Sequence, residues 1–189
     1  MAYFPAFLKF DDKSILIVGG GNIALEKLTH ILNFSSNITL IAKDYLLQTK
    51  SLIDENNLKF FKRAYEKGDI KDFDIVIVAV DDFNLQESIY FETRNHNILC
   101  NCVDLQQYCD FIFPSYIKKG DLTVAISTSG SSPAFAKNFK QYLLKVIPED
   151  VEDFLKELKS LRTIIPKGKE RMQLFDKKVK DYINSWDKR

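Results

Sequence analysis

The sequence has few cysteines and no long apolar run. Cys100, Cys102 and Cys109 are the three cysteines among 189 residues. An odd number in one short stretch favours reduced thiols over a disulfide framework. No run approaches the ~20 apolar residues that span a bilayer, and the first residues lack the basic region and cleavage site of a secretory signal. We therefore expect a cytoplasmic protein with no membrane partner.

Histidine is scarce, and neither sign of charge is in large excess. The chain has two histidines and a net charge of +1. Neither histidine has neighbours that suggest catalysis, and the cysteines lack the four-ligand spacing of a metal centre, so no resident metal is expected. Residues 151–189 carry 11 Lys/Arg against 7 Asp/Glu. This basic tail lacks the dense cluster with interleaved aromatics of a nucleic-acid surface, so we expect no nucleic-acid partner.

What the sequence does contain is an alternation of apolar runs and amphipathic stretches. Five runs are predicted as strands: residues 14–18, 38–42, 58–61, 74–80 and 97–103. Helical spacing of apolar residues follows the first, second and fourth of these runs. Strands that are apolar on both faces and alternate with helices are typical of a parallel sheet covered on both sides. We therefore predict an α/β fold with a Rossmann-like parallel sheet.

The alternation stops near Asp104. Residues 111–114 and 122–126 are predicted as strands, with a turn at 118–121 between them. A helix is expected to start at Pro133, with Ser132 as its N-cap, and to end near residue 146. Two further helices, through residues 154–161 and 172–183, are separated by Pro166-Lys167-Gly168. The carboxyl-terminal part is therefore expected to be helical.

A glycine motif directly follows the first predicted strand and opens a helix. Gly19-Gly20-Gly21-Asn22-Ile23-Ala24 satisfies G-x-G-x-x-A. Gly19 permits the tight turn, Gly21 lets the backbone approach a pyrophosphate, and Ala24 allows close helix–strand packing. The helix N-terminus offers N–H groups and a partial positive charge. The motif predicts dinucleotide binding, and the alternative is a glycine turn without a ligand.

The end of the second predicted strand bears on the choice of cofactor. An acidic residue about 20 residues beyond the glycines usually binds the adenosine ribose. Here the strand ends in Ile41-Ala42-Lys43-Asp44. Asp44 lies slightly late for that role and is equally compatible with capping the next helix, whereas Lys43 would tolerate a 2′-phosphate. NAD is favoured over NADP on this pattern.

Asp104 ends the fifth predicted strand. Open α/β sheets bind ligands at the carboxyl ends of their strands, so this carboxylate is expected near the nicotinamide end of a bound dinucleotide. A carboxylate there can accept a proton. No tyrosine has a lysine four residues later, so the signature of a short-chain dehydrogenase is missing. The alternative role of Asp104 is to cap or terminate the strand.

Five short motifs follow one another along nearly the whole chain. They are Phe4-Pro5-x-Phe7, Gly19-Gly20-Gly21-x-x-Ala24-x-x-Lys27, Asn101-x-Val103-Asp104, Phe111-x-x-Pro114-Ser115 and Val124-Ala125-Ile126-Ser127-Thr128-x-Gly130-x-Ser132-Pro133. In this order and spacing they resemble the precorrin-2 dehydrogenase and sirohydrochlorin ferrochelatase family, the N-terminal half of multifunctional siroheme synthases.

The resemblance implies a division of the chain into three parts. These are an NAD-binding Rossmann domain over residues 1–112, a small α+β dimerisation segment over 113–147 and a helical tail domain over 148–189. It also implies a homodimer. The strands expected at 111–113 and 122–126 support the dimer, because a single chain would leave them as exposed edges.

The resemblance further implies a role in siroheme biosynthesis. Members of the family oxidise precorrin-2 to sirohydrochlorin with NAD, and many then insert ferrous iron to give siroheme. Asp104 matches the family's catalytic aspartate. Residues at positions that resemble its NAD contacts are Asn22, Ile23, Lys43 and Asp44. The substrate's eight carboxylates call for cations or helix N-termini, and the residues expected to bind them are Ser127, Thr128, Ser132 and Lys137.

The chain also departs from the family pattern at three positions. Val80 stands where threonine is common, Lys137 where arginine is common, and Thr128 where some relatives carry a serine. These changes leave the predicted dehydrogenase intact and bear on the chelatase activity, which some members lack. The alternative from another class is a non-enzymatic NAD-sensing regulatory module, which would bind no tetrapyrrole.

Overall fold

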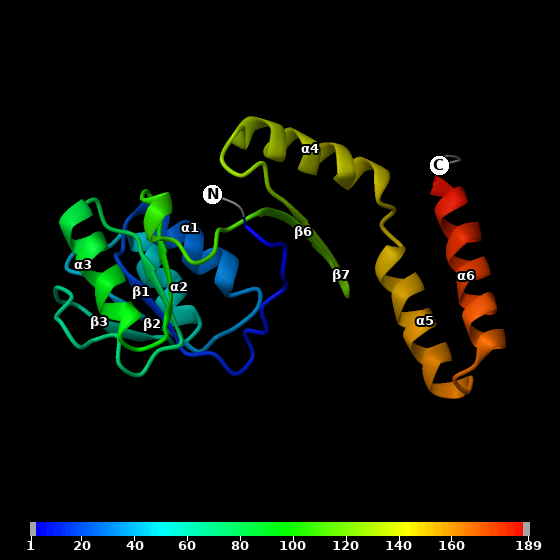
Figure 1. The fold of residues 1–189 in the computed structure, drawn as a ribbon, viewed down its shortest axis with the longest axis horizontal. Coiled ribbons are helices and arrows are strands. Elements are labelled where there is room, and N and C mark those ends of the chain that lie inside the picture. The colour runs from blue at the N-terminus through cyan, green and yellow to red at the C-terminus, as the bar shows by residue number, and fades with distance from the viewer. Residues whose placement is uncertain (1–2, 187–189) are drawn as a thin grey trace. The chain divides into compact units, whose positions relative to one another are not determined.

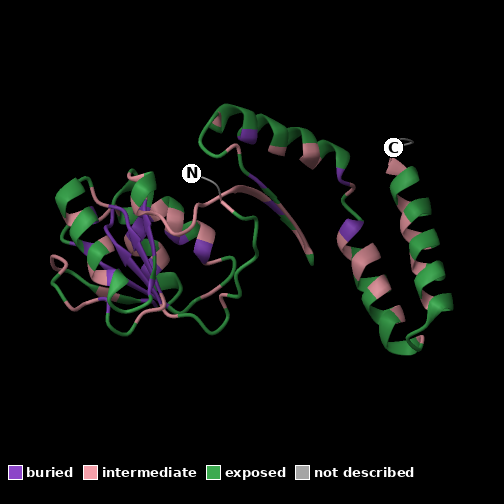
Figure 2. Ribbon diagram, in the orientation of Figure 1, coloured by how far each residue is buried: buried purple, intermediate pink, exposed green. Residues whose placement is uncertain are grey.

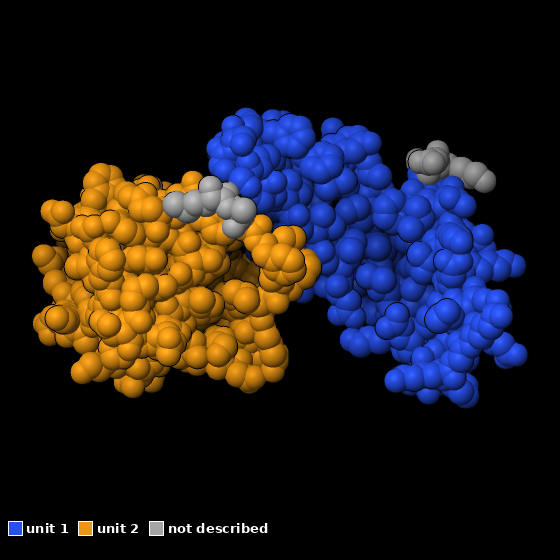
Figure 3. Space-filling model, viewed as in Figure 1, with its two compact units in different colours: residues 1–2, 113–189 blue, residues 3–112 orange. Residues whose placement is uncertain are grey.

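A computed structural model describes residues 3–186 of the chain. It consists of two compact units, one formed by residues 3–112 and the other by the chain from residue 113 onward (Figure 3). Within residues 3–186, none of the helices has both the length and the apolar character needed to cross a membrane.

The first unit is built on a parallel sheet of five strands in the order β3-β2-β1-β4-β5 (Figure 1). The strands are β1 (Ile15–Val18), β2 (Ile38–Ile41), β3 (Lys59–Phe61), β4 (Ile75–Val78) and β5 (Leu99–Cys102). The helices are α1 (Asn22–Ile31), α2 (Leu47–Glu55) and α3 (Phe83–Arg94), and a 3-10 turn, η1 (Gln106–Tyr108), follows β5. The predicted Rossmann-like α/β class is confirmed. The strand order reverses between β1 and β4, which is where open α/β sheets bind ligands.

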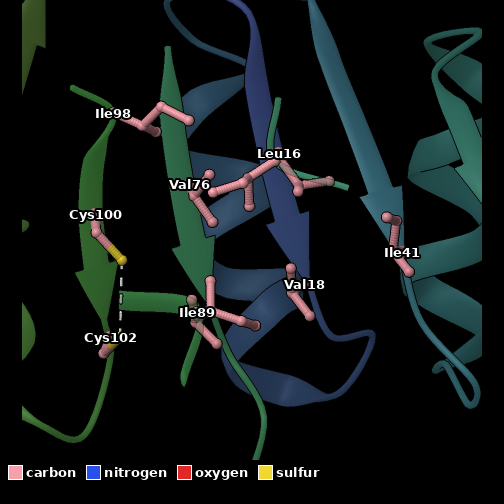
Figure 4. Close-up of a cluster of buried hydrophobic side chains, with 10 residues drawn as sticks. Leu16, Val18, Ile41, Val76, Ile89, Ile98, Cys100 and Cys102 are labelled. Atoms are coloured by element: carbon pink, nitrogen blue, oxygen red, sulfur yellow. Dashed lines mark hydrogen bonds between the residues drawn. The ribbon is translucent and has the colours of Figure 1, made fainter. Parts of the chain in front are cut away.

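The central strands are buried on both faces, as a covered parallel sheet requires (Figure 2). On one face, Leu16 and Val18 pack with Ile89 of α3 in a cluster that includes Cys100 and Cys102 (Figure 4). Alternate strand residues point to opposite faces, so Ile15 and its neighbours on β2 and β4 form the core of the other face. Helix α1 packs against β1 and supplies buried apolar side chains, which are Ala24, Leu28 and Ile31.

The second unit starts with an antiparallel hairpin of β6 (Ser115–Lys119) and β7 (Leu122–Ile126). Three helices follow, α4 (Pro133–Val146), α5 (Val151–Ile164) and α6 (Lys169–Asn184). Ser132 is the N-cap of α4, because its hydroxyl accepts a hydrogen bond from the Phe135 N–H at 3.1 Å. The unit has a small core in which Ile117, Ile147 and Val151 are buried.

The strand predicted at residues 111–114 is wrong. The first strand of the hairpin begins at Ser115, and the lysines assigned to the turn lie inside that strand. Lys119 pairs with Leu122, so the turn is only Gly120-Asp121, and Gly120 has a φ of +56°. A two-residue hairpin turn needs a positive φ at its first residue, which glycine adopts without strain.

Candidate functional site

The first two glycines of the motif are required by close packing of the backbone. Gly19 has a φ of +122°, and a Cβ at this position would lie 2.1 Å from the carbonyl oxygen of Ala79. A Cβ at Gly20 would lie 2.5 Å from the carbonyl oxygen of Asp44 and 2.7 Å from the Cβ of Tyr45. The backbone of the turn is therefore in close contact with the segments that follow β4 and β2.

Gly21 differs from its neighbours because a Cβ here would meet no atom within 4 Å. It is the N-cap of α1, with no side-chain cap and no acidic residue in the first turn of the helix. An α-helix leaves its first N–H groups without intrahelical partners, and these groups favour an anion. Asn22 and Ile23 occupy this first turn. Open space in front of an uncapped helix N-terminus fits a dinucleotide pyrophosphate.

The segment after β2 is tied to the glycine turn. The Leu46 N–H and the Thr49 hydroxyl both donate to the Gly20 carbonyl oxygen at 3.0 Å. Lys43 and Asp44 are exposed in the turn before α2. The alternative in which Asp44 caps this helix is wrong, because Leu46 is the N-cap and no side chain caps it. The structure thus brings the predicted cofactor residues together at the carboxyl ends of β1 and β2.

Asp104 lies in a turn two residues beyond β5. The Val103 N–H donates to the Val78 carbonyl oxygen at 3.2 Å, which continues the pairing of β5 with β4 up to this turn. Two inter-strand spacings of about 4.8 Å separate β5 from β1, so the turn lies on the order of 10 Å from the glycine motif. The carboxylate is exposed and makes no hydrogen bond or ion pair with residues 3–186. It is thus accessible to a ligand at the same edge of the sheet.

A set of hydrogen bonds holds the chain after Asp104 back against β5. Arg94 and Asp110 form a two-pronged ion pair, in which Nη1 lies 2.8 Å from Oδ1. Asp110 also accepts the Cys100 N–H at 2.8 Å, and the Asn101 amide donates to the Phe111 carbonyl oxygen at 2.7 Å. The hydrogen bond to Asp110 raises the pKa of the Arg94 guanidinium.

Arg94, Asp110 and Asn101 thus hold the segment after β5 against that strand. Asp104 lies in the turn where the chain reverses direction. Sequence reasoning missed Arg94 and Asp110, since partners 16 residues apart follow no helical or strand period. Asn101 belongs to the Asn101-x-Val103-Asp104 motif, and that motif was its only signal.

The surroundings of the three cysteines lower the reactivity of their thiols. Cys100 and Cys102 are fully buried on one face of β5, with 3.8 Å between their sulfur atoms (Figure 4). The hydrogen bond with Cys100, followed by burial, raises the pKa of the Cys102 thiol, and burial raises the pKa of Cys109 to about 11. Thiols in this state are weak nucleophiles at neutral pH. Within residues 3–186, no group of three or more His, Cys, Asp or Glu side chains is placed to hold a metal ion.

The predicted substrate residues lie in the second unit, around the loop that opens α4. The Ser127 hydroxyl accepts from the Ser129 N–H at 3.1 Å, and the Thr128 hydroxyl accepts from the Ser132 N–H at 3.1 Å. A hydroxyl that accepts a hydrogen bond still has a proton to donate. Lys137 is exposed one turn into α4. The loop therefore offers hydroxyl donors and a cation to a ligand, but Asp104 belongs to the other unit.

Two family models match the chain. The family described as putative NAD(P)-binding matches residues 6–115, and the family described as sirohaem biosynthesis protein, central, matches residues 119–143. The first match contains the whole parallel sheet, and the second contains all of β7 and most of α4.

Curated relatives carry the name siroheme synthase. The protein of Pseudoalteromonas translucida is 34% identical over 151 residues, which are 80% of this chain and 32% of that protein. The protein of Methylococcus capsulatus is 35% identical over 148 residues, 78% of this chain and 31% of that protein. The chain therefore spans about a third of the length of the curated relatives it matches.

Among solved structures, the chain is similar to one titled "SirC, precorrin-2 dehydrogenase". The TM-score is 0.78, with 21% sequence identity, over 96% of this chain and 91% of that one. This likeness confirms the fold along nearly the whole chain.

Proposed function

We propose that this chain, which belongs to the putative NAD(P)-binding family and is related to siroheme synthases, is an NAD-dependent precorrin-2 dehydrogenase of siroheme biosynthesis. The observation that carries the proposal is the position of Asp104. Its exposed carboxylate lies at the carboxyl edge of the sheet that also holds the glycine turn. A dinucleotide on that turn would extend its nicotinamide end toward this edge.

The residues of the glycine turn would hold and orient the cofactor. Gly19 and Gly20 fix the turn, and the N–H groups of the first turn of α1, at Asn22 and Ile23, would bind the pyrophosphate. Lys43 and Asp44 would contact the adenosine end. When bound, the oxidised nicotinamide ring supplies a hydride acceptor.

Asp104 would act as the general base of the reaction. Oxidation of precorrin-2 removes one hydride and one proton, so a group is needed to accept the proton. The products are sirohydrochlorin, NADH and a proton. An exposed carboxylate without an ion-pair partner among residues 3–186 is suited to take that proton and return it to solvent.

The hydroxyl loop of the second unit would bind the carboxylates of the tetrapyrrole. Ser127, Thr128 and Ser132 supply hydroxyl donors, and Lys137 supplies a charge. We extend the proposal to ferrous iron as a second substrate. Its insertion releases two pyrrole protons, which Asp104 would accept in turn.

We further propose that the chain forms a homodimer through the segment at residues 113–147, with residues 148–189 as a helical tail domain. Support comes from α4, on which Phe135, Phe139 and Tyr142 are 58%, 39% and 59% exposed. Their rings stack in sequence along the helix, with centroids 5.7 Å and 6.2 Å apart. Contiguous exposed aromatic side chains are typical of protein interfaces. We place the protein in the cytoplasm, in keeping with its three free cysteines.

One assay tests the proposed activity. The purified chain is incubated with precorrin-2 and NAD, NADH formation and the tetrapyrrole chromophore are followed, and ferrous iron is then added. We expect NADH and sirohydrochlorin in equal amounts, followed by the spectrum of siroheme. Binding of NAD without any oxidation of precorrin-2 would instead identify a sensing module.

A further inference from the structure

Strand β2 ends without an acidic side chain. In dinucleotide-binding folds, a carboxylate about 20 residues beyond the glycines binds the ribose hydroxyls of NAD. That spacing falls here on Ile41 and Ala42, which are apolar and only 2% and 6% exposed. The next residue is Lys43, and Asp44 follows it. The position that normally favours NAD over NADP is therefore occupied by apolar side chains and followed by a cation.

A second lysine follows the neighbouring strand at the same edge of the sheet. Strands β2 and β3 are parallel, and the Ala42 N–H donates to the Phe61 carbonyl oxygen at 3.2 Å. Lys62 comes directly after β3 and is exposed. It thus lies level with the residues that lead β2 into Lys43.

Tyr45 contacts both the ammonium group of Lys62 and the glycine turn. Lys62 Nζ lies 5.4 Å from the centre of the Tyr45 ring. Tyr45 in turn packs against Gly20, where an added Cβ would lie 2.7 Å from the Tyr45 Cβ. The same ring also makes an edge contact with Phe60, at 5.2 Å between centroids. These contacts fix the position of Tyr45, which touches the glycine turn with its Cβ and Lys62 with its ring.

The third cation of this edge is already neutralised. Arg63 donates two hydrogen bonds of 2.7 Å to the carboxylate of Asp69. By contrast, neither Lys62 nor Lys43 forms an ion pair with a carboxylate of residues 3–186. Two exposed lysines without an ion-pair partner among residues 3–186 therefore follow β2 and β3 at the carboxyl edge of the sheet.

We propose that Lys62 and Lys43 bind the 2′-phosphate of NADP(H), so that this chain accepts the phosphorylated dinucleotide at least as well as NAD(H). The inference rests on the proposed cofactor site and names its second ligand. A 2′-phosphate carries close to two negative charges, and two ammonium groups outweigh the single carboxylate of Asp44. Without the 2′-phosphate, the lysines have no charge to bind at the ribose.

The test is a binding measurement that does not depend on turnover. NADH and NADPH are titrated into the full-length chain, and their fluorescence gives each dissociation constant. The variants are Lys62→Gln, Lys43→Gln and Lys62→Arg, with Lys59→Gln as the matched control. Lys59 is an exposed lysine at the opposite end of the same strand. Thermal melts of each variant confirm that it is folded.

We expect wild type to bind NADPH as tightly as NADH or more tightly. Lys62→Gln should weaken NADPH binding about three- to tenfold, the range of a solvent-accessible charged contact, and NADH binding less than about twofold. Lys43→Gln should weaken NADPH binding more than NADH binding, because Lys43 would also contact the adenosine end of NADH. Lys62→Arg should retain NADPH binding, and Lys59→Gln should change neither dissociation constant. Raising the salt concentration should weaken the binding of NADPH more than that of NADH, because salt screens the attraction between the lysines and the added phosphate charge.

Three outcomes would overturn the inference. If NADH binds and NADPH binds much more weakly, the lysines do not form a phosphate site. If Lys62→Gln and Lys43→Gln weaken both dinucleotides equally, they act on the shared part of the cofactor. Both results would leave the proposed function standing. If neither dinucleotide binds, the proposed function itself fails.

Discussion

The fold does not require a glycine at position 21, whereas binding of the cofactor is expected to require one. The φ of −81° at Gly21 is open to any residue, and an added Cβ meets no protein atom within 4 Å. Gly21→Val should therefore change the free energy of unfolding by no more than about 1 kcal/mol, the scale of an N-cap change. It should weaken NAD binding severely, because the new side chain fills the space in front of the α1 N-terminus. Calorimetric titration with NAD measures the effect.

Gly168 provides the control for this substitution. It also has an open environment and lies outside the glycine motif, directly before α6. Gly168→Val should keep both stability and NAD affinity. Equal NAD affinity in wild type and Gly21→Val would remove the glycine turn from the cofactor site.

Asp104 is the residue on which the proposed chemistry depends. General-base catalysis typically contributes ~10²–10⁴-fold to a rate. Asp104→Ala should lower precorrin-2 oxidation at least about a hundredfold, because the proposed proton acceptor is lost. NAD affinity and the thermal melt should stay near wild type, since the side chain makes no hydrogen bond or ion pair with residues 3–186.

A conservative variant separates the charge of Asp104 from its shape. Asp104→Asn keeps the size of the side chain and loses the basic oxygen, so it should be as slow as Asp104→Ala. Near wild-type oxidation by both variants would show that hydride transfer needs only the position of the cofactor. Asp104 would then be a residue that merely ends the strand.

At the scale of elements, those with a local signal were predicted correctly. The helix after Ser132-Pro133 begins at Pro133, because its cap and first residue are specified by adjacent positions. The strand at residues 111–114 was wrong for the opposite reason. The apolar run around Phe111 is held to β5 by the Asn101 amide, a contact ten residues away. Lysines at positions 118 and 119 hid the true strand, in which only Ile117 is buried.

The candidate site follows the same division. The glycine turn and the carboxyl end of β5 could be located from the sequence, because each directly follows an apolar strand. The Arg94–Asp110 pair and the Tyr45–Lys62 contact could not, since each joins separate elements. Such contacts depend on strand order, which the sequence pattern left undetermined.

The start of β1 is joined to the start of β4 by a carboxylate whose pKa is perturbed. Asp74 accepts hydrogen bonds from the Ser14 N–H and from Lys13 Nζ, both at 2.9 Å. The backbone hydrogen bond from Ser14, followed by the one from Lys13, lowers the pKa of Asp74. A lowered pKa stabilises the fold above the unfolded value of about 4, and this contribution is lost as the pH falls through the folded value.

In Asp74→Asn, the free energy of unfolding should therefore fall less steeply than in wild type as the pH drops below about 4. The side chain is 39% exposed, so solvent screening limits the effect to less than about 1 kcal/mol. Chemical denaturation at neutral and acidic pH gives the free energy of unfolding. Asp72→Asn, at an exposed position two residues away, is the control. Its free energy of unfolding should depend on pH as in wild type. An unchanged slope in Asp74→Asn would mean that the ion pair does not persist in solution.

At the scale of the whole molecule, the residues with proposed roles are divided between the two units. The proposed base and cofactor residues belong to residues 3–112, whereas the hydroxyl loop and the exposed aromatic stripe of α4 belong to the second unit. Among residues 113–186, the core cluster of the second unit contains three buried side chains, Ile117, Ile147 and Val151, and Ile126 and Ala136 are also buried. The exposed aromatic rings beside this small core cluster are the features on which the proposed homodimer rests.

The aromatic stripe of α4 provides the test of the proposed homodimer. Phe139 lies between Phe135 and Tyr142 and stacks with both. Phe139→Asp should shift the chain from dimer to monomer in analytical ultracentrifugation at micromolar concentration. Truncating or charging an aromatic anchor typically costs 2 kcal/mol or more, which is about thirtyfold in Kd.

The matched control is Phe83→Asp, because Phe83 is 57% exposed but lies at the start of α3 in the first unit. That variant should remain a dimer and keep the wild-type melt. A wild-type chain that sediments as a monomer would contradict the dimer outright. A Phe139→Asp chain that sediments as a dimer would move the interface away from α4, to the hairpin or the helical tail.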